Sequence, residues 1–210
     1  MITRLLITLN VVGFLWEISA GGMGMVNGAI PNNSRIVDGL LWPLAVTQHH
    51  QYYRVITTGF LHSGILHLAV NMFSLFMVGR FIEAVLGSPR MLLVYVGSLI
   101  ASSFTVVYFS APDVPTLGAS GAIFGLLGSL FAIGLKFGER GRELVRANIG
   151  ILILNLVFTF SVPVISWQAH VGGLIAGFLL TLVIFWPPQP VRTRVFDPAT
   201  GAEYQSQLES

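Results

Sequence analysis

The sequence predicts an all-α polytopic membrane protein, a single bundle of six transmembrane helices, and three observations support this fold class. Only 10% of the 210 residues are charged and 54% are hydrophobic, whereas soluble domains carry about 25% charged residues. The mean hydropathy is +0.77, so a soluble chain of this length could not bury its apolar surface. Long apolar runs also recur between polar, Pro or Gly breaks.

The first expected span covers residues 4–21. A cleaved signal peptide is the alternative, because the run is short and small residues follow it, but Asn10 and Glu17 inside the run argue against one. Residues 22–56 form a long loop, called loop 1 below, whose apolar pieces are too short to span a membrane. We therefore expect them to lie at the membrane interface or to fold onto the bundle.

Five further spans complete a membrane domain over residues 1–187. They are expected at 64–85, 91–110, 119–137, 148–164 and 168–187. The polar remainder, 188–210, is expected to be a flexible tail.

The distribution of Lys and Arg predicts the orientation. If the N-terminus is cytoplasmic, only Arg35 and Arg54 fall outside, and nine basic residues fall inside: Arg4, Arg80, Arg90, Lys136, Arg140, Arg142, Arg146, Arg192 and Arg194. This bias favours cytoplasmic N- and C-termini. The outer ends of spans 2, 4 and 6 then lie at the same level.

Polar residues gather at that level, in "HSGILHLAVN" (62–71), "GASG" (118–121) and "AHVGG" (169–173). His67, Ser120 and His170 each lie within about a turn of the outer end of a span, and Asn71 lies one turn below His67 on the same helical face. Such groups are costly at membrane depth and usually face a bundle interior or a water-filled cavity.

This set has the chemistry of a serine hydrolase. Ser120 needs a neighbouring base, and His170 is the candidate, because an imidazole is mostly neutral at pH 7. Asp113 lies in the preceding loop and could reach His170 only by folding back, so a Ser–His dyad is favoured over a triad.

The start of span 4 is also suited to stabilising an oxyanion. Its first backbone N–H groups are unpaired, and His67 and Asn71 could add side-chain donors. Gly118 and Gly121 would let a substrate carbonyl approach closely.

Each of these residues also has a structural interpretation. Ser120 could be a packing residue, a single histidine is more often structural, and Asn71 could bond across helices. Gly121-x-x-x-Gly125 and Gly173-x-x-x-Gly177 are typical of close helix packing. The convergence of polar residues from three spans at one level favours function.

With these pieces in this order, the chain resembles the rhomboid intramembrane serine proteases over about residues 1–187. The matching stretches are the three already quoted, extended to "GASGAIFGLLG" and "AHVGGLIAG", together with "GRFIEAVLG" (79–87) and "YYR" (52–54). The resemblance implies a six-helix fold in the plasma or inner membrane, whose active site is open to the extracytoplasmic side. It implies membrane-protein substrates in the lipid bilayer, with no cofactor.

The resemblance also implies residue roles. Ser120 would be the nucleophile and His170 the general base, while His67, Asn71 and the backbone N–H of Ser120 would form the oxyanion hole. Structural roles are implied for His62, for Arg54 in bracing loop 1, and for Glu83 in pairing near the inner face. Two positions depart from a common pattern: Tyr53-Arg54 stands where many relatives have Trp-Arg, and Phe124 stands where Tyr is frequent.

Other functions remain as alternatives. An inactive rhomboid-like protein could bind membrane clients, and a metal site or transporter could use His49, His50, His62, His67 and His170. A metal is not expected, because His62 and His67 are five residues apart, no HExxH occurs, and there are no cysteines to serve as thiolate ligands. The net charge is only +2, so nucleic acid is not an expected partner. The oligomeric state is not fixed by the sequence.

Overall fold

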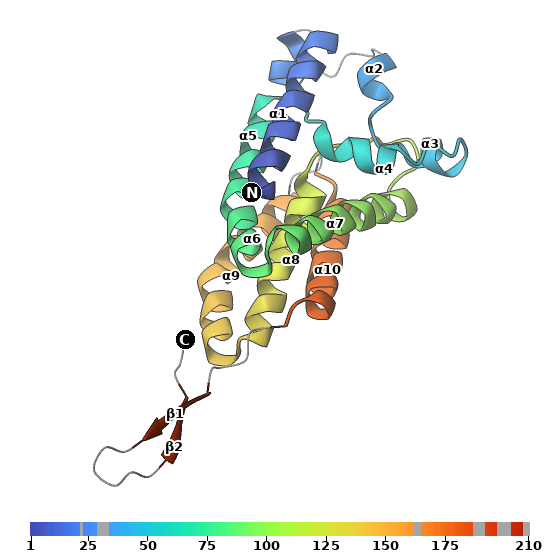
Figure 1. The fold of residues 1–210 in the computed structure, drawn as a ribbon. Coiled ribbons are helices and arrows are strands. Elements are labelled where there is room, and N and C mark those ends of the chain that lie inside the picture. The colour runs from blue at the N-terminus through green and yellow to red at the C-terminus, as the bar shows by residue number, and fades with distance from the viewer. Residues whose placement is uncertain (22, 29–33, 162–164, 187–191, 197–202, 208–210) are drawn as a thin grey trace.

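The computed structural model describes residues 1–21, 23–28, 34–161, 165–186, 192–196 and 203–207. Helices follow all six expected spans (Figure 1). In chain order these are α1 (Ile2–Gly21), α5 (Ile65–Ser74) continued by a π-helical turn (Leu75–Gly79) and α6 (Arg80–Leu86), α7 (Ser88–Phe109), α8 (Ser120–Lys136), α9 (Gly138–Ser161) and α10 (Trp167–Ile184).

The protein is a multi-pass membrane protein. Four described helices are long and apolar enough to cross a membrane: α1, the continuous segment Ile65–Leu86, α7 and α10. Helix α9 contains two parts, Gly141–Gly150 and Asn155–Ser161, that are bent by 43°. They are long and apolar enough to cross a membrane only if they are taken together as one span. Helix α8 has 17 residues, about 26 Å at 1.5 Å per residue, which is short of the hydrocarbon core. The count of six spans therefore stays a prediction.

Helix α9 begins ten residues earlier than the span expected at 148–164. The charged stretch that follows Gly138 continues the helix, with Arg142, Glu143 and Arg146 exposed. Hydropathy marks only the apolar part of a helix, so the polar first turns were missed. The expected end of this span, 162–164, lies outside the described residues.

Helix α8 is the centre of the bundle, and it packs against α10 through glycine. A Cβ atom added to Gly173 would lie 1.9 Å from the carbonyl oxygen of Gly121, and one added to Gly177 would lie 1.9 Å from that of Gly125. No side chain fits at such distances, so the two backbones are in direct contact. The α8 glycines also face α7, where a Cβ on Gly121 would lie 2.2 Å from the Ser102 hydroxyl.

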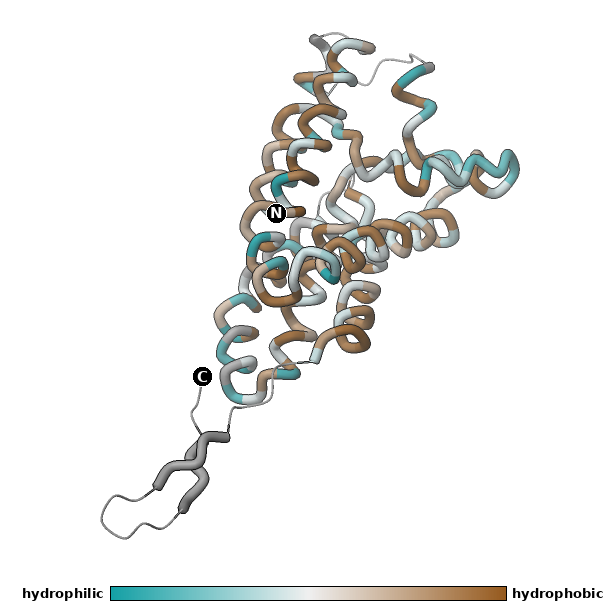
Figure 2. Tube along the Cα trace, viewed as in Figure 1, coloured by the Kyte–Doolittle hydropathy of each residue, from teal (hydrophilic) through white to brown (hydrophobic). Residues whose placement is uncertain are grey.

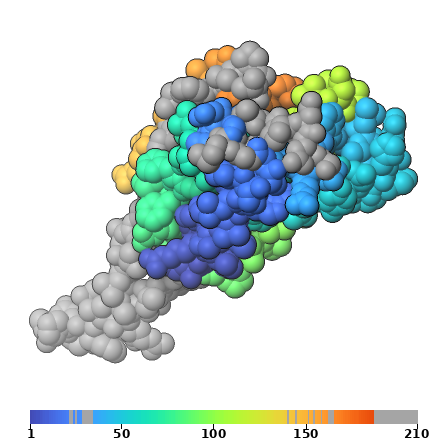
Figure 3. Space-filling model, turned by 90° about the horizontal axis from the view of Figure 1, so that it is seen from above, coloured from blue at the N-terminus to red at the C-terminus, as the bar shows by residue number. Residues whose placement is uncertain are grey.

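Helix α1 is attached to the α5–α6 segment at both ends. Near its start, the Glu83 carboxylate accepts hydrogen bonds from the backbone N–H groups of Ile2 and Thr3 and from the hydroxyls of Thr3 and Ser88. In the part of the chain that the structure describes, Glu83 is thus bonded to backbone amides and hydroxyls. Near its end, the buried Glu17 carboxylate accepts the backbone N–H of His62 at 3.0 Å. Figure 3 shows α1 beside loop 1 on one flank of the molecule.

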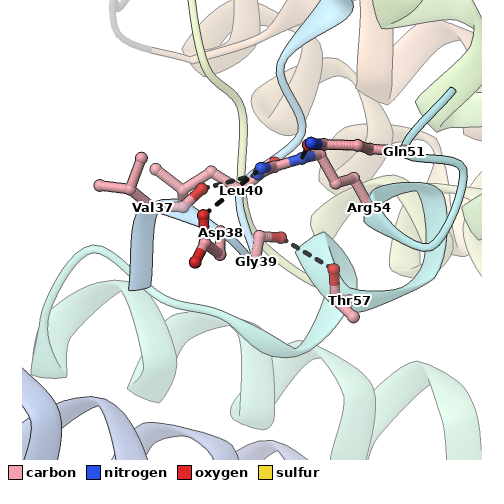
Figure 4. A network of polar contacts seen from close by, with 7 residues as sticks. All are labelled: Val37, Asp38, Gly39, Leu40, Gln51, Arg54 and Thr57. Carbon is pink, nitrogen blue, oxygen red and sulfur yellow. Dashed lines mark hydrogen bonds and ion pairs between the residues drawn. The ribbon is translucent and has the colours of Figure 1, made fainter. Parts of the chain in front are cut away.

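Loop 1 folds into short helical pieces, a 3₁₀ turn (Met23–Asn27), α2 (Ser34–Val37), α3 (Pro43–Thr47) and α4 (Arg54–Thr57). Hydrophilic residues gather on this loop, and the bundle helices are mostly hydrophobic (Figure 2). The side chain of Arg54 is only 5% exposed and donates to the carbonyl oxygens of Val37 and Leu40 at 2.7 and 2.8 Å (Figure 4). These bonds tie the end of α2 to the start of α4. Arg54 also lies 5.4 Å from the ring centroid of Tyr53.

The tail contains a two-stranded antiparallel hairpin, β1 (Arg192–Phe196) paired with β2 (Glu203–Gln207). The expectation of a flexible tail did not include these strands. The β-branched Thr193 and Val195 favour extended backbone. The boundary expected at 187/188 lies outside the described residues, and the flexibility of the tail stays a prediction.

Candidate active site

The candidate nucleophile, Ser120, is the first residue of α8. Gly118 precedes it with φ +122°, a conformation that favours glycine, and its N–H donates to the carbonyl oxygen of Thr58 at 2.9 Å. The N-cap residue Ala119 offers no side-chain hydrogen bond to the helix. The first N–H groups of α8 therefore lie beside the Ser120 hydroxyl without a side-chain cap, where the helix dipole is positive.

The imidazole of His170 contacts that hydroxyl directly. Its Nε2 lies 2.8 Å from Ser120 Oγ, across the α8–α10 interface. Ser166 caps α10 by accepting the N–H of Ala169 at 3.3 Å, which fixes where the helix starts. The two backbones touch at Gly121, next to Ser120, and at Gly173, about one turn after His170, so the Ser–His distance is set by backbone packing.

Two side chains orient the His170 ring. Phe124 stacks on it, with ring centroids 4.0 Å apart and planes 14° from parallel. On the other edge, Thr159 Oγ1 lies 2.7 Å from His170 Nδ1. Thr159 was not among the residues predicted from the sequence, although its hydroxyl inside the apolar run "LNLVFTF" (154–160) of α9 was a signal that could have found it.

His67 approaches from α5. Its Nδ1 accepts the backbone N–H of Ser63 at 3.3 Å and lies 3.1 Å from the Ser63 hydroxyl. A neutral imidazole that accepts at Nδ1 carries its proton on Nε2. A Cβ on Gly118 would lie 3.0 Å from this Nε2 and 3.7 Å from Ser120 Oγ. His67 and Ser120 therefore flank the same glycine, and His67 presents a donor there.

Asn71 lies one turn below and is 4% exposed. Its Nδ2 donates to the backbone carbonyl oxygen of His67 at 2.9 Å, so one of the two amide hydrogens is used inside α5. The structure thus brings His67, Ser120 and His170 together at one level. It places Asn71 behind His67, with its amide group bonded to the His67 backbone.

His62 lies where loop 1 meets α5 and is fully buried. Its ring packs edge-on against His67, with centroids 5.2 Å apart, and both ring nitrogens lack a hydrogen-bond partner among the described residues. Burial, helped by repulsion from His67, lowers the pKa of His62 to about 3. His62 is therefore neutral at physiological pH and packs as an aromatic side chain behind His67.

A rhomboid domain family model matches residues 49–187, about two thirds of the chain. The chain belongs to the rhomboid family. It is 37% identical to rhomboid protease GluP of Bacillus subtilis over 190 residues, which are 88% of this chain and 35% of GluP. It is 35% identical to the putative rhomboid protease YdcA of the same organism over 151 residues, 69% of this chain and 76% of YdcA.

Family membership alone does not decide whether this rhomboid is active. The inactive RHOMBOID-like protein 8 of Arabidopsis thaliana is 34% identical over 157 residues, 72% of this chain and 43% of that protein. The chain spans about a third of GluP and less than half of this plant relative. Activity must therefore be argued from the residues present in this rhomboid.

The histidines of this rhomboid do not assemble into a metal site. Within the described residues, no group of three His, Cys, Asp or Glu side chains lies close enough to hold an ion. His49 and His50 are exposed on loop 1, away from the nitrogen-bearing side chains around Gly118.

Proposed function

We propose that this rhomboid is an intramembrane serine endopeptidase that uses a Ser120–His170 dyad. The observation that carries the proposal is the 2.8 Å contact between His170 Nε2 and Ser120 Oγ at the start of α8. A serine hydroxyl is a weak nucleophile until a base at hydrogen-bond distance takes its proton. An inactive family member would not need this pair, and here both residues are present and in contact.

The proposed reaction follows from these positions. Ser120 Oγ attacks the carbonyl carbon of the scissile peptide while His170 Nε2 takes the hydroxyl proton. The oxyanion is stabilised by the backbone N–H of Ser120 and by the Nε2–H of His67, with Asn71 in support. His170 then gives the proton to the leaving amine, the acyl-enzyme forms, and a water molecule activated by His170 releases the second product.

The proposed substrates are membrane proteins, cleaved in or near their transmembrane segments. A helical substrate hides its carbonyl groups in its own hydrogen bonds, so it must unwind locally before Ser120 can attack. Water must also reach the site, which requires a polar opening framed by the outer helix ends. With cytoplasmic termini in the plasma or inner membrane, as the basic residues predict, that opening faces the extracytoplasmic side.

Covalent labelling tests this proposal. Wild-type protein should react with a fluorophosphonate probe and cleave a single-span model substrate. Ser120→Ala should lose both while remaining folded in detergent, because loss of a serine nucleophile costs about 10⁶ in kcat in other hydrolases. Near-normal cleavage by Ser120→Ala would disprove the proposal.

The second candidate is an inactive client-binding protein, which the similarity to the inactive Arabidopsis relative favours. An inactive protein would bind single-span clients without labelling or cleavage. Activity abolished by EDTA or o-phenanthroline and restored by zinc would instead indicate a metalloenzyme, and under the dyad mechanism chelators should have no effect.

A further inference from the structure

Helix α9 reaches the dyad through one hydroxyl. Thr159 is 3% exposed, and its Oγ1 makes two short contacts. One is to His170 Nδ1 at 2.7 Å, and the other is to the backbone carbonyl oxygen of Asn155, one turn earlier in α9, also at 2.7 Å. Both distances are those of hydrogen bonds.

These two contacts determine where the hydrogens lie. A carbonyl oxygen has no hydrogen, so the bond to Asn155 must use the single hydrogen of the Thr159 hydroxyl. The hydroxyl then has only lone pairs for His170, and the second bond needs a hydrogen on Nδ1. A neutral imidazole carries one N–H, so Nε2 is left with a lone pair that faces Ser120 Oγ at 2.8 Å.

We propose that Thr159 is a positioning residue that holds His170 in the tautomer required of a general base. This inference rests on the proposed serine-protease function and explains how a dyad manages without a carboxylate. In a Ser–His–Asp triad the aspartate fixes the tautomer, and here a neutral oxygen on α9 does so. Thr159 gains and loses no proton during the reaction: its oxygen accepts from Nδ1–H both before and after Nε2 takes the proton of Ser120.

Stacking on Phe124 cannot select one tautomer of His170. The Phe124 ring lies nearly parallel to His170, so it restrains the plane of the imidazole but contacts both nitrogens alike. Thr159 Oγ1 lies at one ring nitrogen, Nδ1, so it interacts differently with the two tautomers. Phe124 and Thr159 thus restrain different properties of the same ring.

The experiment compares Thr159→Val with Thr159→Ser. Valine keeps the shape and removes the acceptor, whereas serine keeps the hydroxyl. Thr105→Val is the matched control, because Thr105 Oγ1 also donates to a carbonyl oxygen one turn earlier, that of Ala101 at 2.9 Å, on helix α7. Thermal unfolding checks each variant, and Thr159→Ala replaces Thr159→Val if the valine does not fit.

We expect Thr159→Val to lower kcat and the fluorophosphonate labelling rate by about 10- to 100-fold, as for loss of a buried hydrogen bond. KM should change by less than about 2-fold, since substrate binding is not involved. Thr159→Ser and Thr105→Val should retain wild-type kcat. Equal activity of wild type and Thr159→Val, or an equal loss in Thr159→Ser, would overturn the proposal.

A second measurement does not depend on activity. In ¹⁵N–¹H spectra of the histidine rings, with His170 assigned from His170→Ala, wild type should show Nδ1 protonated and Nε2 unprotonated. Thr159→Val should shift protons to Nε2. A wild-type ring protonated on Nε2 would overturn the tautomer assignment, whereas an unlabelled Ser120 with the expected tautomer would overturn only the protease proposal.

Discussion

The two walls of the site are held in different ways. On one wall, α8 and α10 touch through their backbones at Gly121 and Gly173, and this contact sets the distance from Ser120 to His170. On the other wall, α9 contributes one hydroxyl. The outward face of α9 is open, with Ile149, Ile153, Val157 and Phe160 between 40 and 64% exposed, where lipid would cover it.

This difference separates two requirements of the dyad. The nucleophile–base distance depends on glycine packing, which admits no side chain. The tautomer of the base depends on where the end of α9 that carries Thr159 stands. Helix α9 touches the α8 backbone at its other end, where a Cβ on Gly141 would lie 1.8 Å from the Gly134 carbonyl oxygen. A substitution on the first wall should therefore unfold or separate the helices, whereas a substitution on the second should leave a folded protein with impaired chemistry.

The largest effect is expected at the glycine contact. Gly173→Ala would place Cβ 1.9 Å from the Gly121 carbonyl oxygen, so the helices must separate. We expect a loss of about 3 kcal/mol or more of stability, at the upper end for overpacking, and a loss of activity because the dyad distance lengthens.

The matched control is Gly150→Ala on α9, where an added Cβ would meet no described heavy atom within 4 Å. Alanine has higher helix propensity than glycine by about 1 kcal/mol, so this variant should be as stable as wild type or more so. Thermal unfolding of both variants in detergent checks the pair. Equal destabilisation of the two would show that the walls do not differ.

The next-largest effect is a loss of kcat expected from changes in α5, which, like α9, contributes side chains to the site. His67→Ala removes the Nε2–H donor beside Gly118, and loss of one oxyanion donor costs about 10²–10³ in kcat. Asn71→Ala should cost less, because one amide hydrogen is already used on the His67 carbonyl oxygen. Both should affect kcat more than KM, since the oxyanion exists mainly in the transition state.

Steady-state kinetics on one reconstituted substrate, with His170→Ala as the inactive reference, measure this difference. The roles would be reversed if Asn71→Ala were inactive while His67→Ala stayed within about tenfold of wild type.

A pH-dependent effect is expected from the titration of His62 behind His67. The folded-state pKa is lowered by burial to about 3, and a histidine in the unfolded chain has a pKa of about 6.5. As pH falls below 6.5, the unfolded state gains a proton that the folded state does not. Stability should therefore fall by up to about 1.4 kcal/mol per pH unit between pH 6.5 and 3.

Unfolding measured from pH 7 to 4 checks this dependence. His62→Leu should lose that part of the slope, and His49→Leu on the exposed part of loop 1 should keep it. An unchanged slope in His62→Leu would show that the pKa of His62 is not lowered in the fold.

The sequence could predict the parts of this site that follow from helix position. Ser120, His67 and His170 lie near the ends of strongly apolar runs, so their shared level followed from span boundaries and the basic residues. The positions of Gly173 and Gly177 followed from their spacing. Thr159 was not predicted, although Asn148, Asn155 and Thr159 recur at helical spacing on one face of α9. Which neighbour this polar face meets depends on the rotation of α9 about its axis, and the sequence does not fix that rotation.

The smallest effect separates stacking from hydrogen bonding at His170. Phe124 lies on α8, the tight wall, and its ring stacks on the imidazole at 4.0 Å. Phe124→Leu keeps an apolar side chain but removes the aromatic pair, which contributes about 0.5–1.5 kcal/mol beyond area burial. We expect kcat to fall by only about 2- to 10-fold, because Gly121–Gly173 contact still sets the Ser–His distance and Thr159 still accepts from Nδ1. The test measures Phe124→Leu and Thr159→Val with the same substrate. The first variant removes the restraint on the plane of the His170 ring, and the second removes the restraint on which ring nitrogen carries the proton. If the leucine variant were the more damaged of the two while its stability stayed normal, the ring plane would be the restraint that limits catalysis, and α8 would supply both the distance and the orientation of the base.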